Sequence, residues 1–574
     1  MSQQLAENLP KQLLPRSDAK EQSEEEEAPV PAPVPAGAAP PTPGIPADFE
    51  TAIDAAGFGM FNILLLVAAV PAAMGTVYET STMSYILPSA ECDLKLSLLD
   101  KGILNAITYA GMISSAVFWG YFADTKGRRK LLIYGYAIDT ICVLGGAFSQ
   151  SVVQLMVFKY FGGFCMSGPF AVLMTYLTEL HGRQHRQRIM MIVGIMFSIA
   201  TLTLPGLAML ILPQDWELNI WSFKMTAWQM FVAVTALPSL LSSMLFPLFP
   251  ESPKFLMSRG RNQEALEAFQ FMYALNTRKL KDSYPFKVLA NEVPEQVTKH
   301  KAHTEVKLPI ESSEAACAPP VDPELAAVPK SGLSAGLSQL RPLFTKPYLG
   351  LSLWVYLLNF CVLLGQNTMR LWLPQLFASI NEFEHQVGGP SGETSICRIL
   401  EFSVNRTQSK LMAITDTAAE CTVNVTAATY TNNLIVAAAG LVAYMLAGFL
   451  VNLVGVKRIM TVGLFCAACC SIGMYWSSSA ASTVAIASLF VTMGSISATS
   501  VISASVSLFP TSLRTMIVSL EMMFGRLGSL LGNIFFPALM GLGCVPPFFM
   551  ISFFMLAGCL MAAFLPLKNK AALK

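Results

Sequence analysis

Long apolar stretches recur along the chain and restrict its fold more than any other feature does. Each is about 20 residues long, which is the length that a helix needs to cross the hydrocarbon core of a bilayer. Unbonded backbone groups are costly in lipid, and the short alternating segments of a membrane barrel are missing, so we predict helices. Twelve spans are expected, at roughly 57–78, 102–123, 131–149, 153–178, 189–212, 229–249, 348–376, 432–454, 459–477, 482–506, 517–540 and 546–566.

The composition agrees with a protein that crosses the membrane many times. Of 574 residues, 53% are hydrophobic and only 13% are charged, and the net charge is +1. A soluble domain carries about 25% charged residues. The neutral balance and the lack of a basic stripe with aromatic residues give no reason to expect a nucleic-acid partner. No nucleophile–base spacing, phosphate loop or Cys/His metal spacing stands out, so we expect neither an enzyme nor a metal or cofactor.

A polar stretch of roughly a hundred residues divides the spans into six and six. The expected fold is an all-α membrane protein of 12 transmembrane helices in two six-helix bundles, and internal repeats often produce such halves. Near helical spacing of Leu266, Phe269 and Met272 predicts a short amphipathic helix in the linker. The expected segments are a disordered acidic, Pro-rich tail (1–55), a first bundle (56–249), a linker (250–346), a second bundle (347–566) with a glycosylated loop (378–431), and a C-terminus (567–574).

Lysine and arginine collect in the loops on one side of the predicted bundle, which the positive-inside rule assigns to the cytoplasm. Both termini and the linker are then cytoplasmic. The glycosylation sequons at Asn405 and Asn424 fall on the opposite side, in agreement with this orientation. The basic residues are Lys126, Arg128, Arg129, Lys130, Arg183, Arg186, Arg188, Lys457, Arg458 and Arg514.

Four cysteines are predicted on the oxidising side, where disulfides form. They are Cys92, Cys397, Cys421 and Cys544. Four cysteines allow three connectivities, between which the sequence does not choose. A disulfide between Cys397 and Cys421, both in the loop 378–431, is the pairing that we name as a candidate. The remaining cysteines sit mostly in spans, where they are expected to act as small core residues.

The turn after the second span has the spacing G-x-x-x-D-x-x-G-R-R, at Gly120, Asp124, Gly127, Arg128 and Arg129. A basic loop alone would only set topology. This spacing, however, resembles the loop signature of the major facilitator superfamily. The stretches "YILPSAECDL", "GILNAITYAGMISSAVFWGYFAD" and "PESPKFLMSRGRNQEAL" resemble the synaptic vesicle glycoprotein 2 family, which is near the sugar and organic ion transporters. The resemblance covers the first six spans best, and the loop 378–431 is much shorter than the large luminal domain of the vertebrate members.

The resemblance implies that this turn is a conformational latch. Gly120 would let the second span approach a neighbouring helix closely, and Asp124 would lie near the start of span eleven, where a helix N-terminus attracts an anion. Glu179 and Arg186 match the E-x6-R spacing of sugar-porter-like proteins. The stretch "SLFPTSLR" that ends at Arg514 resembles a second such element, but Ser507 replaces its acid.

Charged side chains at membrane depth are candidates for function, because placing one there costs several kcal/mol unless it faces a partner or a cavity. Glu79 is the first candidate, since it matches an acidic position of the family on a span that lines the central cavity, although Thr76 stands where relatives carry a second acid. Asp139 could pair with Lys159 or carry protons. Glu521 and Arg526 are a little over one turn apart and could neutralise each other. The full set is Glu79, Asp139, Lys159, Arg370, Glu521 and Arg526.

Two functions remain open. The leading one is a secondary-active or facilitative transporter of a small organic solute, an organic ion or a sugar, that works by alternating access with H⁺ or Na⁺ as optional coupling ions. The alternative is a synaptic-vesicle-type glycoprotein that acts mainly as a scaffold for cytoplasmic partners of the N-terminal tail. The missing acids at Thr76 and Ser507 favour the scaffold, whereas the retained latch and buried charges favour transport. We expect a monomer in the bilayer of the plasma membrane or of an intracellular vesicle.

Overall fold

The structure is a computed structural model that describes residues 46–214, 216–220, 223–290, 341–387, 395–415, 426–477, 479–510 and 513–566. The regular secondary structure of this part is helical, apart from an antiparallel hairpin of β1 (Leu218–Ile220) and β2 (Phe223–Met225) and one isolated bridge. Within it, eleven helical segments are long and apolar enough to span a membrane. A further long helix, α3, packs among them, so the prediction of a twelve-helix membrane fold is confirmed.

The first half contains the helices from α2 to α8. Ser97 caps α3 by accepting a hydrogen bond from the Asp100 amide, and Gly127, with φ of 100°, separates α3 from α4. The predicted sixth span is broken between α7 and α8, where Pro238 lacks a backbone donor. The helices are α2 (Met60–Ala90), α3 (Leu98–Lys126), α4 (Arg128–Ala147), α5 (Val152–Glu179), α6 (Arg186–Ile211), α7 (Ala227–Thr235) and α8 (Leu237–Leu245).

The second half contains the remaining long helices and one helix that the sequence did not predict. α14 (Ile396–Thr415) fills much of the expected loop 378–431, and α13 runs about three turns beyond the end of its predicted span. Short 3₁₀ turns, η4 (Arg341–Phe344) and η5 (Met474–Trp476), precede α13 and follow α16. The spanning helices are α13 (Leu349–Val387), α15 (Ala427–Val454), α16 (Val456–Gly473), α17 (Ala480–Leu508), α18 (Arg514–Met540) and α19 (Val545–Ala563).

Short helices gather at one end of the first half. They are α1 (Phe49–Ala56), η1 (Phe246–Leu248), α9 (Pro253–Ser258), α10 (Asn262–Thr277) and η2 (Lys281–Ser283). α10 occupies the place of the expected amphipathic helix and buries Leu266, Phe269 and Met272. The expected tail differs, because α1 buries Phe49 and contacts α10, so the chain is already folded within the range 1–55. Residues 1–45 and 291–340 lie outside the described part.

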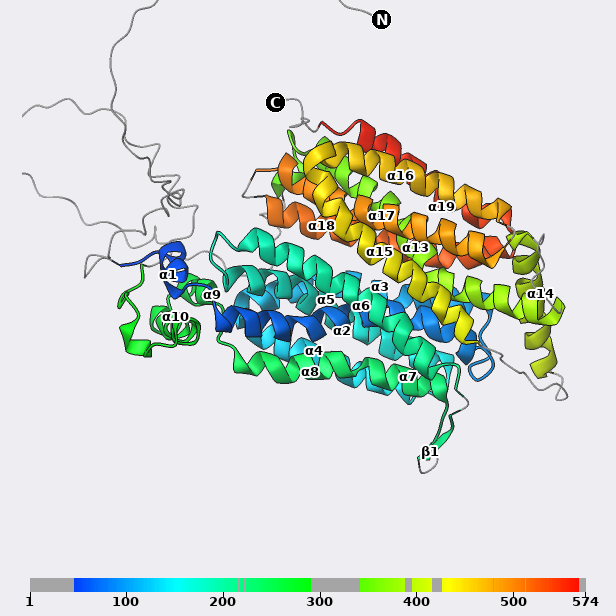
Figure 1. The fold of residues 1–574 in the computed structure, drawn as a ribbon, viewed down its shortest axis with the longest axis horizontal. Helices are drawn as coiled ribbons and strands as arrows, with labels where there is room; N and C mark the ends of the chain where they lie inside the picture. Colours follow the sequence, from blue (N-terminus) through cyan, green and yellow to red (C-terminus); the bar gives the residue numbers. More distant parts are fainter. Residues whose placement is uncertain are drawn as a thin grey trace, which may run out of the picture. The chain divides into compact units, whose positions relative to one another are not determined.

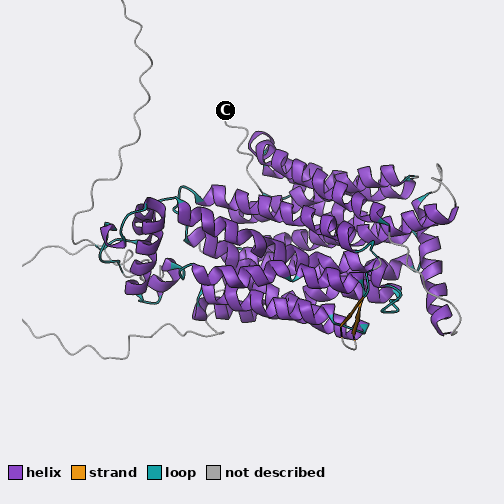
Figure 2. Ribbon diagram, turned by 60° about the horizontal axis from the view of Figure 1, so that its bottom comes forward, coloured by secondary structure: helices purple, strands orange, loops and turns teal. Residues whose placement is uncertain are grey.

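The two halves pack through three pairs of helices: α3 with α18, α6 with α15, and α2 with α13. Figure 1 shows α2 to α8 on one side and α13 to α19 on the other. Figures 1 and 2 both place α1, α9 and α10 at one end of the long helices and α14 at the other. These ends are called the α10 end and the α14 end below. The apolar clusters lie almost entirely within one half, with Leu371 and Tyr430 as the residues of the second half that join clusters of the first.

Candidate functional site

Hydrogen bonds between the halves lie from the middle of the bundle to the α14 end in the described part of the chain. Tyr430 donates to the Tyr85 carbonyl oxygen at 3.3 Å, and the Thr407 hydroxyl donates to Glu91 Oε1 at 3.0 Å. Asn105 Nδ2 on α3 donates to the Leu371 carbonyl oxygen at 3.5 Å. The halves are therefore joined most firmly at the α14 end.

Two glycines on α3 show the same difference between the α14 end and the α10 end. A Cβ on Gly102 would lie 2.5 Å from Pro537 Cγ and 2.6 Å from the Asn533 carbonyl oxygen, so α3 and α18 touch at the α14 end. A Cβ on Gly120, near the α10 end, would meet no described heavy atom within 4 Å. The close helix approach expected at Gly120 is thus wrong for this conformation, because α5 packs against α3 through the neighbouring Trp119 and no described atom faces Gly120 itself. It occurs at Gly102 instead.

Two arginines of the second half reach into the interface. Arg370 Nη1 on α13 donates to Ser81 Oγ on α2 at 3.2 Å, and Arg526 Nη1 on α18 donates to Ser167 Oγ on α5 at 3.0 Å. Tyr109 on α3 is buried and lies beside both guanidinium groups. Among the described residues neither arginine forms an ion pair. This interface around Arg370, Arg526 and Tyr109 is called the seam.

A buried ion pair joins α2 and α5 within the first half. Lys159 Nζ lies 2.6 Å from Glu79 Oε2 and also donates to the Glu79 carbonyl oxygen at 3.1 Å. Both side chains are at most 2% exposed. Gly162 makes room for the carboxylate, because a Cβ there would lie 2.5 Å from Glu79 Oε1. The two charges compensate each other and hold α2 against α5.

Asp139 on α4 binds a hydroxyl rather than a cation. The Ser239 hydroxyl on α8 donates to Asp139 Oδ2 at 2.6 Å. Gly75 on α2 packs against the same serine, since a Cβ there would lie 2.6 Å from Ser239 Oγ. The expected pairing of Asp139 with Lys159 is wrong, because the ammonium group is bonded to Glu79. A role for Asp139 in carrying protons stays a prediction.

Glu521 and Arg526 do not neutralise each other. Arg526 points to the first half, whereas Glu521 is fully buried beside Ser505 on α17 and Tyr356 on α13. Neither carboxylate oxygen of Glu521 has a hydrogen-bond partner within the described chain. Five positions along a helix correspond to a rotation of about 140°, which explains why the two side chains face different neighbours.

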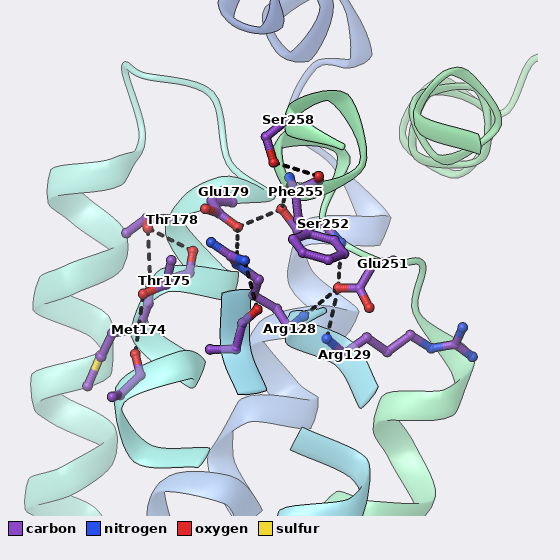
Figure 3. A network of polar contacts seen from close by, with 12 residues as sticks. Arg128, Arg129, Met174, Thr175, Thr178, Glu179, Glu251, Ser252, Phe255 and Ser258 are labelled. Atoms are coloured by element: carbon purple, nitrogen blue, oxygen red, sulfur yellow. Dashed lines mark hydrogen bonds and ion pairs between the residues drawn. The ribbon is translucent and has the colours of Figure 1, made fainter. Parts of the chain in front are cut away.

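The turn between α3 and α4 is held by an acid that the sequence analysis did not single out. Glu251 Oε1 accepts hydrogen bonds from the backbone amides of Arg128 (2.8 Å), Arg129 (2.9 Å) and Ser252 (3.1 Å), as Figure 3 shows. A carboxylate at the free amides of a helix start stabilises that helix. A Cβ on Gly127 would collide with the Glu251 carboxylate, so only glycine fits this turn.

Glu179 and Arg186 each bind a different partner. Glu179 Oε2 accepts from Ser252 Oγ at 2.6 Å and lies 3.5 Å from Arg128 Nε (Figure 3). Arg186 binds Glu50 of α1 through both terminal nitrogens, at 2.8 and 3.0 Å. The E-x6-R spacing therefore connects α5 to the α4 turn and α6 to α1, rather than forming one pair.

Other members of the predicted latch are placed as follows. Arg514 begins α18 and donates Nε to the Phe509 carbonyl oxygen at 3.2 Å. Asp124 lies in α3, but its side chain is outside the described part of the structure. Glu251 could have been found from "PESP" in the stretch that carries the family resemblance. Glu50 could not, because it falls in the predicted tail.

α14 is attached to the second half by a disulfide between Cys397 and Cys544, whose Cα atoms are 5.1 Å apart. The candidate pairing of Cys397 with Cys421 is thus wrong, because α14 lies against the start of α19. Cys92 is disulfide-bonded too. Asn405 is exposed on α14, as a glycosylation site requires, while Asn424 and Cys421 lie outside the described residues.

Comparisons with known proteins agree with this architecture. A sequence model of the Major Facilitator Superfamily matches residues 55–393. Synaptic vesicle glycoprotein 2B of Rattus norvegicus is 31% identical over 232 residues, which cover 40% of this chain and 34% of that protein. Synaptic vesicle glycoprotein 2C of Mus musculus is 28% identical over 40% of this chain and 32% of its own length. The match thus spans about a third of each curated relative.

Solved structures with the same fold include two of xylose transporters. The xylose transporter XylE from E. coli, in a partially occluded inward open conformation, matches with a TM-score of 0.58 and 14% identity over 88% of this chain and 100% of that one. A D-xylose-proton symporter matches with a TM-score of 0.58 and 15% identity over 89% and 99%. At such identities the likeness shows the arrangement of helices alone.

Proposed function

The chain belongs to the major facilitator superfamily, and from that premise we propose that it transports a small organic solute across a membrane by alternating access. In this mechanism two rigid halves rock around a central site that opens to each face in turn. The family points to transport rather than to catalysis. Because the curated relatives are matched over only part of their length, the activity and the solute are proposals.

The observation that carries this proposal is the seam between the halves. Arg370 and Arg526 reach from the second half to serine hydroxyls of the first. A hydrogen bond to a neutral hydroxyl contributes only about 1 to 3 kcal/mol, so a solute or a rocking motion can replace it. Charged side chains at the centre of a membrane bundle are costly unless they face a partner or a cavity, and they commonly mark a solute pathway.

The turn at Gly127 supplies a rigid element at the α10 end. We expect Gly120, Asp124, Gly127, Arg128, Arg129 and Arg514 to close that end when the α14 end opens, with Glu179 holding the turn through Arg128 and Arg186 holding α1 against α6. Open space beside Gly120 agrees with a latch that is released in this conformation. The α10 end is then cytoplasmic, and the sequons at Asn405 and Asn424 face the outside or a vesicle lumen.

Coupling to H⁺ or Na⁺ would use the buried carboxylates. Glu79, Asp139 and Glu521 each have a buried oxygen without a hydrogen-bond partner in the described chain. Such an oxygen is a place where a proton or a small cation would be stabilised. We expect a monomer in a vesicle or plasma membrane. The names of the relatives favour a synaptic vesicle.

A scaffold that binds cytoplasmic partners through the N-terminal tail is the second candidate. Thr76 favours it, because this residue takes the place of a second family acid and is satisfied inside the first half by the Ala72 carbonyl oxygen at 3.1 Å. A transporter and a scaffold differ in one measurable property, which is solute flux across a sealed membrane.

The deciding experiment is uptake of labelled organic anions, organic cations and sugars into liposomes that contain the purified protein. We expect uptake of one class, and we expect Glu79→Gln to abolish most of it because Lys159 loses its buried partner. Glu267→Gln, on the exposed face of α10, is the matched control and should transport normally. Absence of uptake of every solute, together with capture of partners by the tail, would favour the scaffold.

A further inference from the structure

The charges at membrane depth leave the seam with an uncompensated positive charge. Lys159 is neutralised by Glu79, and Asp139 faces Ser239 within the first half. Glu521 lies on a different face of α18, beside Ser505 and Tyr356. Of the ionisable groups considered above, only the two arginines and the neutral Tyr109 therefore face the seam.

Both guanidinium groups act on the same tyrosine. Tyr109 lies beside both Arg370 and Arg526, although they come from different helices. Each arginine has five N–H donors, of which Arg370 uses donors on Ser81 and Tyr109 and Arg526 uses one on Ser167. Both arginines are half-buried, so their remaining donors are not sealed inside a core. The seam therefore has a surplus of charged donors.

Neutral polar groups extend this site along the same helices. Asn367, one turn before Arg370 on α13, donates Nδ2 to Ser529 Oγ on α18 at 2.7 Å. Ser529 itself lies one turn after Arg526. Asn105, one turn before Tyr109 on α3, has a buried side-chain oxygen without a hydrogen-bond partner in the described chain. These groups would contact parts of a bound molecule that lie beyond its charge.

We propose that the seam binds an organic anion, whose carboxylate or phosphate group sits between Arg370 and Arg526 and accepts a hydrogen bond from Tyr109. Guanidinium groups match such oxyanions with two parallel N–H donors, and the anion would offset the cost of two cations at membrane depth. A cationic solute would be repelled, and a neutral sugar would leave both charges uncompensated. Transport of this anion rests on the function proposed above, but its binding can be measured independently.

The test is the unfolding temperature of the purified full-length protein as a function of probe concentration, since a ligand that binds the folded state stabilises it. The anionic probes are benzoate, glutarate and glycerol 3-phosphate. Benzamide and glycerol are the matched neutral molecules, benzylammonium is the cation, and chloride is the inorganic anion. We expect stabilisation by at least one organic anion and none by the neutral or cationic molecules. Added salt should weaken the binding.

Variants then assign the site. Arg370→Gln and Arg526→Gln should each weaken anion binding on the order of tenfold to hundredfold. Arg526→Lys keeps the positive charge and should lose less anion affinity. This variant also keeps the test valid if a glutamine variant fails to fold. Arg261→Gln removes an exposed arginine paired with Glu264 outside the seam and should bind like wild type.

Several results would overturn the proposal. They are stabilisation by the neutral or cationic molecules to the same extent, stabilisation by chloride alone, no stabilisation by any organic anion, or unchanged binding in both glutamine variants. Uptake of a sugar or cation by a protein that binds no anion would leave the proposed transport intact and remove the anion site. Anion binding without any solute flux would support the anion site and contradict the proposed transport.

Discussion

At the scale of single residues, burial decides which ionisable groups carry charge. His181 follows α5 and is completely buried, with Nδ1 2.6 Å from the Leu177 carbonyl oxygen. Burial lowers its pKa to about 4, and the nearby charges of His185 and Arg186 act in the same direction, against the bond to Leu177. The folded protein therefore keeps this ring neutral at a pH where an unfolded chain protonates it.

The stability of the protein should depend on pH through His181. The unfolded chain binds this proton from about pH 6.5 downwards and the folded chain only near pH 4. The contribution of the neutral His181 ring to the free energy of unfolding is thus complete above pH 6.5. It is lost as pH falls from 6.5 to about 4, by up to about 3 kcal/mol. The measurement is thermal unfolding across this range. His181→Gln should flatten the curve, and an equally steep curve in the variant would contradict the assignment.

Residue types and spacing predicted the candidates well but not their partners. Gly127 was expected from the motif, and the buried charges were expected from their depth in the spans. Partner choice depends on which helices meet: Arg526 and Ser167 are 359 positions apart, and Glu251 and Arg128 are 123 apart. A pattern within one helix could only offer Glu521 as the partner of Arg526, which the structure excludes.

At the scale of elements, two turns with a glycine at positive φ separate the effect of backbone strain from that of a specific contact. Gly127 and Gly455 immediately precede α4 and α16, with φ of 100° and 89°. A Cβ would strike the Glu251 carboxylate at Gly127 but meets no described atom within 4 Å at Gly455. The positive φ favours glycine at both positions, but only at Gly127 would a side chain also collide with a neighbouring group.

Gly127→Ala should therefore destabilise the protein more than Gly455→Ala. Both substitutions carry the cost of placing a side chain at positive φ with extended ψ, about 1 to 3 kcal/mol. Gly127→Ala also displaces the carboxylate that binds the first amides of α4, for a further loss of about 1 to 3 kcal/mol. Thermal unfolding of the two variants side by side measures the difference. Equal losses would mean that Glu251 does not stabilise the turn.

The contact between α2 and α5 depends on compensation of charge. Lys159→Met should leave Glu79 buried and unpaired, at a cost of about 3 to 5 kcal/mol. The double variant Lys159→Met, Glu79→Gln removes both charges and should recover most of that loss. A double-mutant cycle on unfolding temperature gives the coupling. Additive effects would show that the pair contributes nothing beyond its separate side chains.

At the scale of the whole molecule, the structure joins its halves at the α14 end. Gly102→Ala should weaken that contact, because its methyl group would press on Pro537 and on the Asn533 carbonyl group. The population should shift towards conformations that are open there. Spin-label distances between α3 and α18 at the α14 end measure this opening. Gly120→Ala, which adds a methyl group in open space, should not lengthen them, and lengthening by both variants would contradict the role of Gly102.

The disulfide from Cys397 to Cys544 has a consequence for any reagent that binds outside the bundle. It closes a loop of 147 positions and makes α14 part of the second half, whereas one hydrogen bond from Thr407 reaches Glu91 of the first. An antibody fragment that binds α14 alone would move together with the second half and would not restrict its movement relative to the first half. To hold the protein in one conformation, the fragment would have to bind the first half as well.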